Sequence, residues 1–238
     1  MNSLTVIDFH SHILPALDHG CEKIEECRGQ LELMSDCGTH IAVATSHFYP
    51  HMHNIGVFAD KVDAAVGRIQ ASSMTKAPTL CVGAEVLLYA GLNNMEDLER
   101  LCIKGTKLLL IELPNSDIND AHIETLEGML RDGYGIILAH IDRYLSKHAE
   151  EIDYILSLGA VAQVNAYSLA SKSTRKKILH YLETTDKICA LGSDLHGVDA
   201  KNYKKFVKAQ KILSDYYSEI MRRSGELLKN AERFNVIK

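Results

Sequence analysis

Two histidines separated by one residue, His10 and His12, are the first residues in the chain that are suited to metal chemistry. They lie at the end of a run of strand-forming residues that begins at Leu4. Side chains alternate between the two faces of a β-strand, so residues i and i+2 project together. We therefore expect the two imidazoles to share one face, as a metal-binding pair requires. Alone the pattern is weak, because two such histidines are equally compatible with a solvated face.

Ionisable or amide residues also end the other apolar strands that the sequence predicts. In chain order they are His47, Glu85, Glu112, His140, Asn165, Asp194 and His196. The carboxyl ends of the strands form a single face in α/β barrels, so these side chains should converge. Burying so many of them is costly unless a cation compensates. Histidine and carboxylate ligands without cysteine suit Mn²⁺, Zn²⁺ or Fe²⁺, and two or three such ions can share bridging carboxylates.

Seven short apolar strands alternate with longer amphipathic helices. The expected strands are residues 4–10, 40–46, 79–84, 107–112, 134–139, 160–165 and 187–192. Helices are expected near 22–36, 58–72, 95–102, 118–131, 146–158, 173–183, 202–215 and 218–230. This alternation predicts an α/β fold with a parallel sheet and right-handed crossovers, either closed as a seven-stranded barrel or open and doubly wound. No linker or repeat divides the chain, so we expect one domain over residues 1–238.

The composition is that of an ordinary soluble globular protein, with 238 residues, 46% hydrophobic and 24% charged. A net charge of −5 without any basic run argues against nucleic-acid binding. The apolar runs are too short to cross a bilayer, and Met1-Asn2-Ser3 leads into a strand without a signal-peptide pattern. Six scattered cysteines without any Cys-x-x-Cys pair indicate reduced thiols. We therefore expect a cytoplasmic protein without membrane insertion; the oligomeric state is not predicted.

The order of these motifs along the whole chain resembles the PHP (polymerase and histidinol phosphatase) superfamily. The stretch His-Ser-His-Ile-Leu-Pro at 10–15, followed by Leu-Asp-His-Gly at 17–20, is similar to the bacterial capsule-type protein-tyrosine phosphatases, the CpsB/YwqE family. Further matches are Ala-Thr-Ser-His at 44–47, Gly-Ala-Glu-Val at 83–86, Leu-Ile-Glu-Leu-Pro at 110–114, Leu-Ala-His-Ile-Asp-Arg-Tyr at 138–144, Gln-Val-Asn-Ala at 163–166 and Gly-Ser-Asp-Leu-His-Gly at 192–197.

The resemblance implies a distorted seven-stranded (β/α)7 PHP barrel that holds two or three divalent ions, most often Mn²⁺, with iron or zinc as alternatives. The ligand sets that it implies are His10, His12, Glu85 and Asp194 for one ion, Glu112 and His140 for a second, and His47, His196 and His19 for a third. Arg143 matches an arginine that contacts the substrate phosphate.

Two positions depart from the family pattern. His19 stands where the family usually has an aspartate, which lowers the negative charge of the third ion site and favours a softer metal. The basic residue nearest to the Asp-x-His motif is Lys201, where the family often has arginine. Lysine binds phosphate as a point charge without the bidentate fork of arginine.

The function that the resemblance implies is a metal-dependent phosphomonoesterase. A metal-bound hydroxide would attack phosphorus in line, Arg143 would neutralise the phosphoryl oxygens, and His196 or a metal-held water would supply a proton to the leaving group. The implied substrate is phosphotyrosine, on the tail of a bacterial tyrosine kinase that controls capsular or exopolysaccharide synthesis. Two alternatives remain: hydrolysis of histidinol phosphate or another small phosphoester, and a non-catalytic PHP module that regulates a partner.

The remaining histidines and cysteines carry weaker signals. His51 and His53 are expected in a substrate loop or in solvent, and His40, His122, His148 and His180 at the surface. Cys21 precedes no Cys-x5-Arg phosphate loop, so thiol-based phosphatase chemistry is not expected. The cysteines are expected to act as small core residues.

Overall fold

The computed structural model describes residues 4–237, and residues 1–3 and 238 of the expected domain lie outside that range. Its strands are β1 (Ile7–His12), β2 (Ile41–Phe48), β3 (Thr79–Leu87), β4 (Leu108–Glu112), β5 (Gly135–Leu138), β6 (Val161–Asn165), β7 (Ile188–Gly192) and β8 (Leu195–His196). Its α-helices are α1 (Ile24–Asp36), α2 (Ile55–Ala71), α3 (Asp120–Arg131), α4 (Ala149–Ser157), α5 (Lys172–Thr184), α6 (Ala200–Leu213) and α7 (Asp215–Leu227). Four 3₁₀ turns complete the list: η1 (Leu92–Asn94), η2 (Leu98–Leu101), η3 (Ile141–Arg143) and η4 (Ala166–Ala170).

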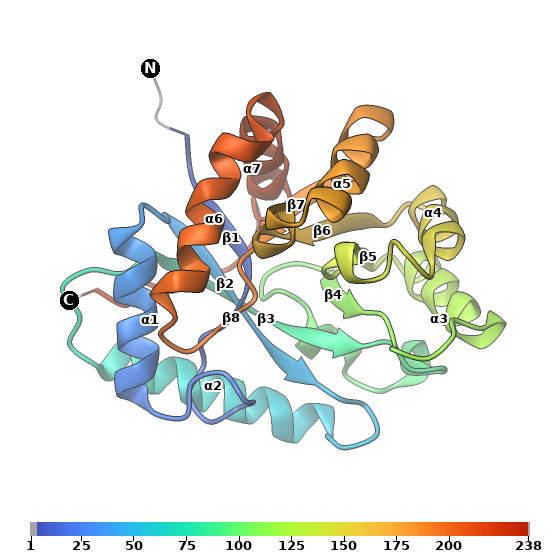
Figure 1. Ribbon diagram of the computed structural model, residues 1–238. Coiled ribbons are helices and arrows are strands. Elements are labelled where there is room, and N and C mark those ends of the chain that lie inside the picture. The colour runs from blue at the N-terminus through green and yellow to red at the C-terminus, as the bar shows by residue number, and fades with distance from the viewer. Residues whose placement is uncertain (1–3, 238) are drawn as a thin grey trace.

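The strands form one parallel sheet in the order β7-β6-β5-β4-β3-β2-β1-β8 (Figure 1). The seven expected strands are all present, but the expected count is wrong by one, because β8 adds a two-residue strand beside β1. The sheet curls so that β7 approaches β1 without forming a ladder with it. Two backbone amides cross this seam, Asp194 N to His10 O at 2.8 Å and Ser193 N to Asp8 Oδ1 at 2.9 Å. The sheet is therefore a curled half-barrel.

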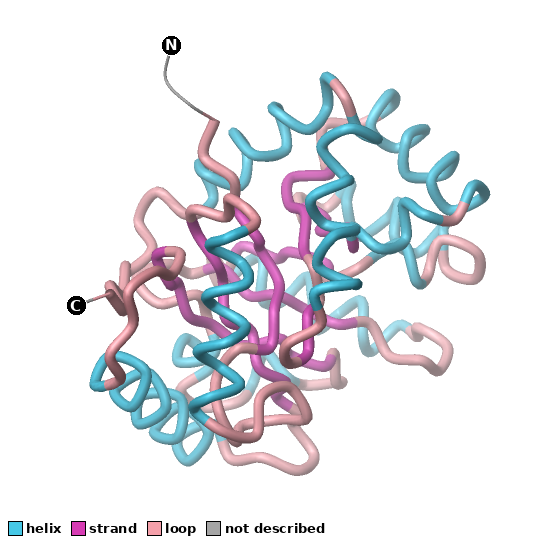
Figure 2. Tube along the Cα trace, turned by 60° about the vertical axis from the view of Figure 1, so that its left-hand side comes forward, coloured by secondary structure: helices cyan, strands magenta, loops and turns pink. Residues whose placement is uncertain are grey.

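Helices surround the strands (Figure 2), and one hydrophobic core joins them. The strands are buried on both faces, which explains their continuous apolar character. Asn54 and Asn119 cap α2 and α3 by accepting bonds from the backbone amides of Val57 and His122.

One expected helix, at 95–102, is wrong. The segment contains only the short turn η2, and Asp97 just before that turn has φ of 62°, a left-handed conformation that interrupts a helix.

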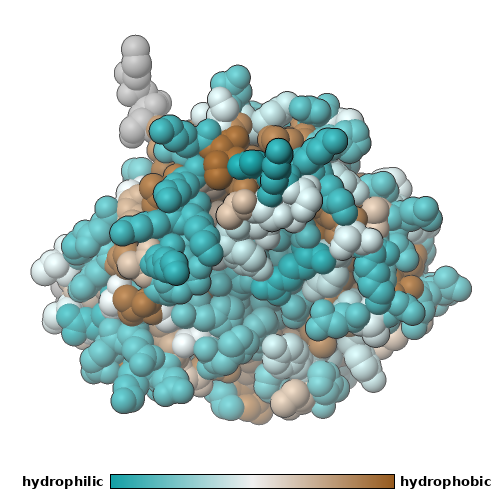
Figure 3. Space-filling model, viewed as in Figure 1, coloured by the Kyte–Doolittle hydropathy of each residue, from teal (hydrophilic) through white to brown (hydrophobic). Residues whose placement is uncertain are grey.

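The face of the molecule seen in Figure 3 is mostly hydrophilic, with hydrophobic residues in small separate patches. Within residues 4–237, none of the helices combines the length and apolar character that a membrane span needs.

Candidate metal centre

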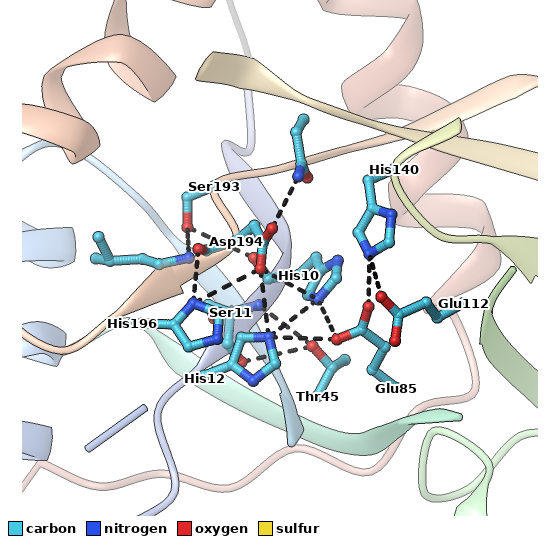
Figure 4. A network of polar contacts seen from close by, with 12 residues as sticks. His10, Ser11, His12, Thr45, Glu85, Glu112, His140, Ser193, Asp194 and His196 are labelled. Atoms are coloured by element: carbon cyan, nitrogen blue, oxygen red, sulfur yellow. Dashed lines mark hydrogen bonds and ion pairs between the residues drawn. The ribbon is translucent and has the colours of Figure 1, made fainter. Parts of the chain in front are cut away.

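Side chains from the ends of β1, β2, β3, β4 and β7 and from the turn after β5 point toward one another at the carboxyl edge of the sheet (Figure 4). His10 and His12 project together as the strand alternation predicts, with their Nε2 atoms 3.2 Å apart. Both side chains are fully buried. Two imidazole nitrogens at this distance from each other, facing the same carboxylates, have the arrangement that a metal site requires.

Glu85 lies at the centre of the cluster. Its Oε2 is 3.1 Å from Nε2 of His10 and 3.0 Å from Nδ1 of His47, and its Oε1 is 2.6 Å from Nε2 of His140. Burial alone would raise the pKa of this carboxyl, but the charge and hydrogen bond of His10, with the bonds from His12 and His140, hold it well below its usual range. Glu85 is therefore an ionised carboxylate that several imidazoles share.

Glu112 faces Glu85, and the contacts that compensate its charge are long. Its Oε1 is 3.8 Å from Nε2 of His140, and its Oε2 is 4.0 Å from Nδ1 of His47. Burial, followed by the neighbouring charge of Glu85, raises its pKa. Two carboxylates held this close and away from water favour a cation between them.

Asp194 completes the ring of acidic groups from the β7–β8 turn. Its Oδ1 is 3.4 Å from Nε2 of His12, while Oδ2 accepts a 2.9 Å hydrogen bond from Nδ2 of Asn165 and an ion pair from Arg143. Asp194 and His140 have φ of 53° and 30°, in the left-handed region. Such conformations cost about 1–3 kcal/mol each and persist where the surroundings fix them.

Four groups of three residues place their ligand atoms within 4.8 Å of one another in residues 4–237. They are His10–His12–Asp194, His10–Glu85–His140, His47–Glu85–Glu112 and His12–His47–His196. Buried Nε2 of His196 lacks a hydrogen-bond partner in the described part of the chain, and Nδ1 of His47 faces the carboxylates of Glu85 and Glu112. Imidazole and carboxylate donors with such an unpartnered nitrogen suit divalent transition metals.

His19 lies beside these groups without joining any of them. Its exposed ring stacks at 4.9 Å on His47 and at 4.4 Å on His196, measured between centroids. Asp18, the residue before it, points inward instead. Asp18 Oδ2 accepts a 2.8 Å bond from Nδ1 of His12 and a 3.0 Å bond from the amide of His47.

Asp18 and Gln163 hold the rings of the cluster from behind, a role that the sequence reasoning missed. The bond from Asp18 leaves Nε2 of His12 free to face the cluster. Gln163 Oε1 lies 3.2 Å from Nδ1 of His10 and accepts a 2.6 Å bond from the amide of His140. The sequence signals that could have found them are the Leu-Asp-His-Gly and Gln-Val-Asn motifs. These motifs contain Asp18 and Gln163 but do not show in which direction the side chains point.

Arg143 stands at the mouth of the cluster, 39% exposed. It bonds the Tyr167 hydroxyl at 3.2 Å and lies 3.8 Å from Glu112. A cavity of about 280 Å³ opens beside it, lined also by His196, Asn202 and Lys205. Lys201 is exposed in the first turn of α6 and does not line this cavity.

The remaining predicted residues lie around this centre. Backbone N–H of Tyr49 donates to Nδ1 of His53 at 3.1 Å, so His53 stabilises its own loop. His148 is buried at the start of α4, 3.5 Å from Glu151, so the expectation of a surface position is wrong; the turn after η3 folds it inward. Cys21 is buried, and burial raises its pKa to about 12, which makes it a poor nucleophile.

A family model described as capsular polysaccharide synthesis, CpsB/CapC, matches residues 6–234 of this chain. The chain belongs to the CpsB/CapC family. Among curated relatives, the tyrosine-protein phosphatase CpsB of Streptococcus pneumoniae is 24% identical over 213 residues, covering 82% of this chain and 85% of CpsB. The tyrosine-protein phosphatase YwqE of Bacillus subtilis is 26% identical over 215 residues, covering 83% of this chain and 80% of YwqE.

The fold of the CpsB/CapC family is also found in solved structures. A structure from work on YwqE of Bacillus subtilis and CpsB of Streptococcus pneumoniae, metal-dependent tyrosine phosphatases, superposes with a TM-score of 0.77. The sequence identity is 21%, and the match covers 95% of this chain and 96% of that one. The resemblance noted in the sequence is thereby confirmed at the level of family and fold.

Proposed function

We propose that this member of the CpsB/CapC family is a metal-dependent phosphomonoesterase that acts on phosphotyrosine in proteins. The observation that carries the proposal is the buried cluster in which Glu85 is shared by four histidines, with Arg143 at its mouth. The tyrosine-phosphatase names of the CpsB and YwqE relatives support the choice of substrate.

Two or three divalent ions, Mn²⁺ by family resemblance, would be held by the four groups described above. One ion would take His10, His12 and Asp194 with Glu85, a second Glu112 with His140 or His47, and a third His196 with His47 and His12. When bound, such ions lower the pKa of a coordinated water and neutralise phosphoryl oxygens.

The protein's own residues orient the substrate. Arg143 presents a planar guanidinium that suits phosphate oxygens, and Asp194 and Tyr167 fix its direction. Tyrosine is a good leaving group, since a phenol has a pKa of about 10 and needs little protonation. Burial, followed by the charge of His12, lowers the pKa of His196 to about 4. His196 is thus neutral at pH 7, and we assign it to metal ligation in preference to proton donation.

The partner that we propose is a bacterial tyrosine kinase of capsule synthesis that carries phosphotyrosine on its tail. We propose that the two proteins interact in the cytoplasm. The family description of capsular polysaccharide synthesis supports this assignment. All six cysteines are unpaired, which agrees with a reducing compartment.

The test is hydrolysis of a phosphotyrosine peptide by the purified protein supplied with Mn²⁺, compared with p-nitrophenyl phosphate and a small alkyl phosphate. We expect turnover of both aryl phosphates, loss of activity with a chelator and recovery on adding Mn²⁺. Preference for the alkyl phosphate would favour the small-phosphoester alternative. Absence of turnover together with absence of bound metal would favour the regulatory module.

A further inference from the structure

A large cavity lies away from the candidate metal centre, in a groove between α4 and α5. Figure 1 shows these two helices on the outer side of β5 and β6. The cavity measures about 1050 Å³ and is mainly apolar. We call it the α4–α5 groove; it is lined by residues along both helices, from Leu145 and Ser173 at one end to Ser157 and Lys187 at the other.

One end of the groove adjoins the mouth of the metal centre. Leu145 follows Arg143 by two residues, and α5 begins directly after η4, which carries Tyr167. Tyr167 in turn bonds Arg143 at 3.2 Å. A chain whose phosphotyrosine reaches Arg143 therefore has the groove beside it.

The length of the groove suits a short extended peptide. Helix α5 has 13 residues, so the wall is about 20 Å long at 1.5 Å per residue. An extended chain advances about 3.3 Å per residue, so roughly six residues would cover that wall.

The two walls differ in chemistry. The α5 wall carries Lys176 and Lys177, with Lys187 just beyond the helix. None of these lysines forms an ion pair within residues 4–237, and Nζ of Lys177 donates to the backbone oxygen of Leu145 at 3.4 Å. The α4 wall presents Ala149 and Leu156.

The acidic groups of the groove are fewer than its cations. Asp153 is occupied by the Tyr181 hydroxyl at 2.7 Å, and Asp186 is the other acid in the lining. The whole chain has a net charge of −5, so the excess of lysines on the α5 wall is a local departure from the negative charge of the chain.

We propose that the α4–α5 groove binds an acidic segment of the substrate protein that flanks its phosphotyrosine; this rests on the function proposed above. In an extended segment, side chains alternate, so carboxylates would face the lysines of α5 while apolar residues face α4. A lysine ammonium is a point charge and lacks the planar fork with which arginine binds phosphate through two hydrogen bonds. The lysines of this wall therefore suit separate carboxylates better than a second phosphate.

The experiment compares three substrates: a phosphotyrosine peptide with six flanking residues of alternating Glu and Leu, the same peptide with Gln for Glu, and p-nitrophenyl phosphate. Each peptide is made with the flank on either side of the phosphotyrosine. The variant K176E/K187E is compared with K204E/K208E, which changes charge equally on the exposed face of α6, away from the groove.

We expect K176E/K187E to raise KM for the acidic peptide about tenfold, with kcat unchanged, and to leave the Gln peptide and p-nitrophenyl phosphate unaffected. An equal effect of K204E/K208E would overturn the proposal, because long-range charge would then explain the preference. Equal KM values for the Glu and Gln peptides with the unaltered protein would also overturn it.

Two further readouts separate the failures. If no substrate is hydrolysed, the proposed function fails, while fluorescence anisotropy with the labelled acidic peptide still tests the groove through the same pair of variants. Sedimentation with vesicles of anionic phospholipid, abolished by K176E/K187E, would assign the groove to a membrane surface and overturn the peptide proposal.

Discussion

The inner and outer parts of the metal centre are built differently. The inner rings, His10 and His12, are fully buried, and Gln163 and Asp18 hold their far nitrogens. The outer rings of His19, His47 and His196 stack on one another near the mouth, and within residues 4–237 the cluster-facing Nε2 of His196 lacks a hydrogen-bond partner. Hydrogen bonds of the protein itself thus position the inner part, whereas ring stacking holds much of the outer part, and we expect a bound ion to order that part further.

Glu85 belongs to both parts, so its loss should have the largest effect. Glu85→Gln keeps the shape but removes the charge that four histidines share. We expect kcat/KM for p-nitrophenyl phosphate to fall by at least about 10²–10³-fold, as when a transition-state electrostatic group is removed. Metal content, measured by inductively coupled plasma spectrometry, should fall with it. Glu99→Gln, at an exposed residue, is the control. A fall in kcat/KM of less than tenfold in Glu85→Gln would contradict the assignment of Glu85 as a shared ligand.

Asp18→Asn tests whether the inner part is held from behind. The change weakens the bond to Nδ1 of His12 without touching a proposed ligand atom. Loss of such supporting carboxylates costs about 10–100-fold in metal affinity or activity, and we expect that range here. Titration with Mn²⁺ against activity measures it. Asp117→Asn, at an exposed ion pair with Lys147, should be neutral; unchanged Mn²⁺ affinity in Asp18→Asn would show that packing alone orients His12.

The outer part should make the metal-free protein sensitive to acid. His196 has a folded-state pKa of about 4, below its ordinary 6.5, so the unfolded chain binds the proton more readily. Its stabilising effect is present above pH 6.5 and is lost as pH falls toward 4. Allowing for partial exposure, we expect a loss on the order of 1–2 kcal/mol.

Urea unfolding of the chelator-treated protein at pH 7 and pH 4.5 measures this loss. The pH effect should shrink in His196→Gln and persist in His180→Gln, which alters an exposed residue. If the free energy of unfolding falls equally between pH 7 and pH 4.5 in the unaltered protein and in both variants, the acid sensitivity comes from other groups.

His19→Ala should have the smallest effect. Its ring stacks on His47 and His196 but joins none of the four ligand groups. We expect less than a tenfold change in kcat/KM, because a stacking contact is worth about 0.5–1.5 kcal/mol. A drop comparable with that of Asp18→Asn, accompanied by loss of one metal equivalent, would instead make His19 a ligand.

The sequence could predict the strand ends because parallel strands bring them to one edge. The register pairs His47 directly with Glu85, and the alternation of His10 and His12 holds. The grouping of ligands could not be predicted, since it depends on side-chain distances across the mouth of a curled sheet. Asp18 was equally hidden, because the direction of a loop side chain has no period. The two-residue β8 falls below the length at which an apolar pattern can be recognised.

Close packing around the inner histidines requires glycine at two positions, a requirement that the sequence does not show. A Cβ on Gly192 would lie 2.6 Å from Cβ of His10 and 2.6 Å from Nε2 of Gln163. A Cβ on Gly20 would lie 2.6 Å from Cβ of His12. Both glycines are thus required because a neighbouring chain segment lies too close for a side chain. From the sequence motifs alone, a turn would have been enough to explain a glycine at each position.

The seam between β1 and β7 also has a consequence for how the protein is made. The amide of Ser193 bonds Asp8 across 185 positions of sequence, so β1 is synthesised long before its partners on that side. At about 5–20 residues per second, the nascent chain waits roughly 10–40 s with this edge of β1 unpaired. An unpaired strand edge invites association with other chains. This edge of β1 therefore stays unpaired until Ser193 has been synthesised, and we expect chaperones to protect it during that interval.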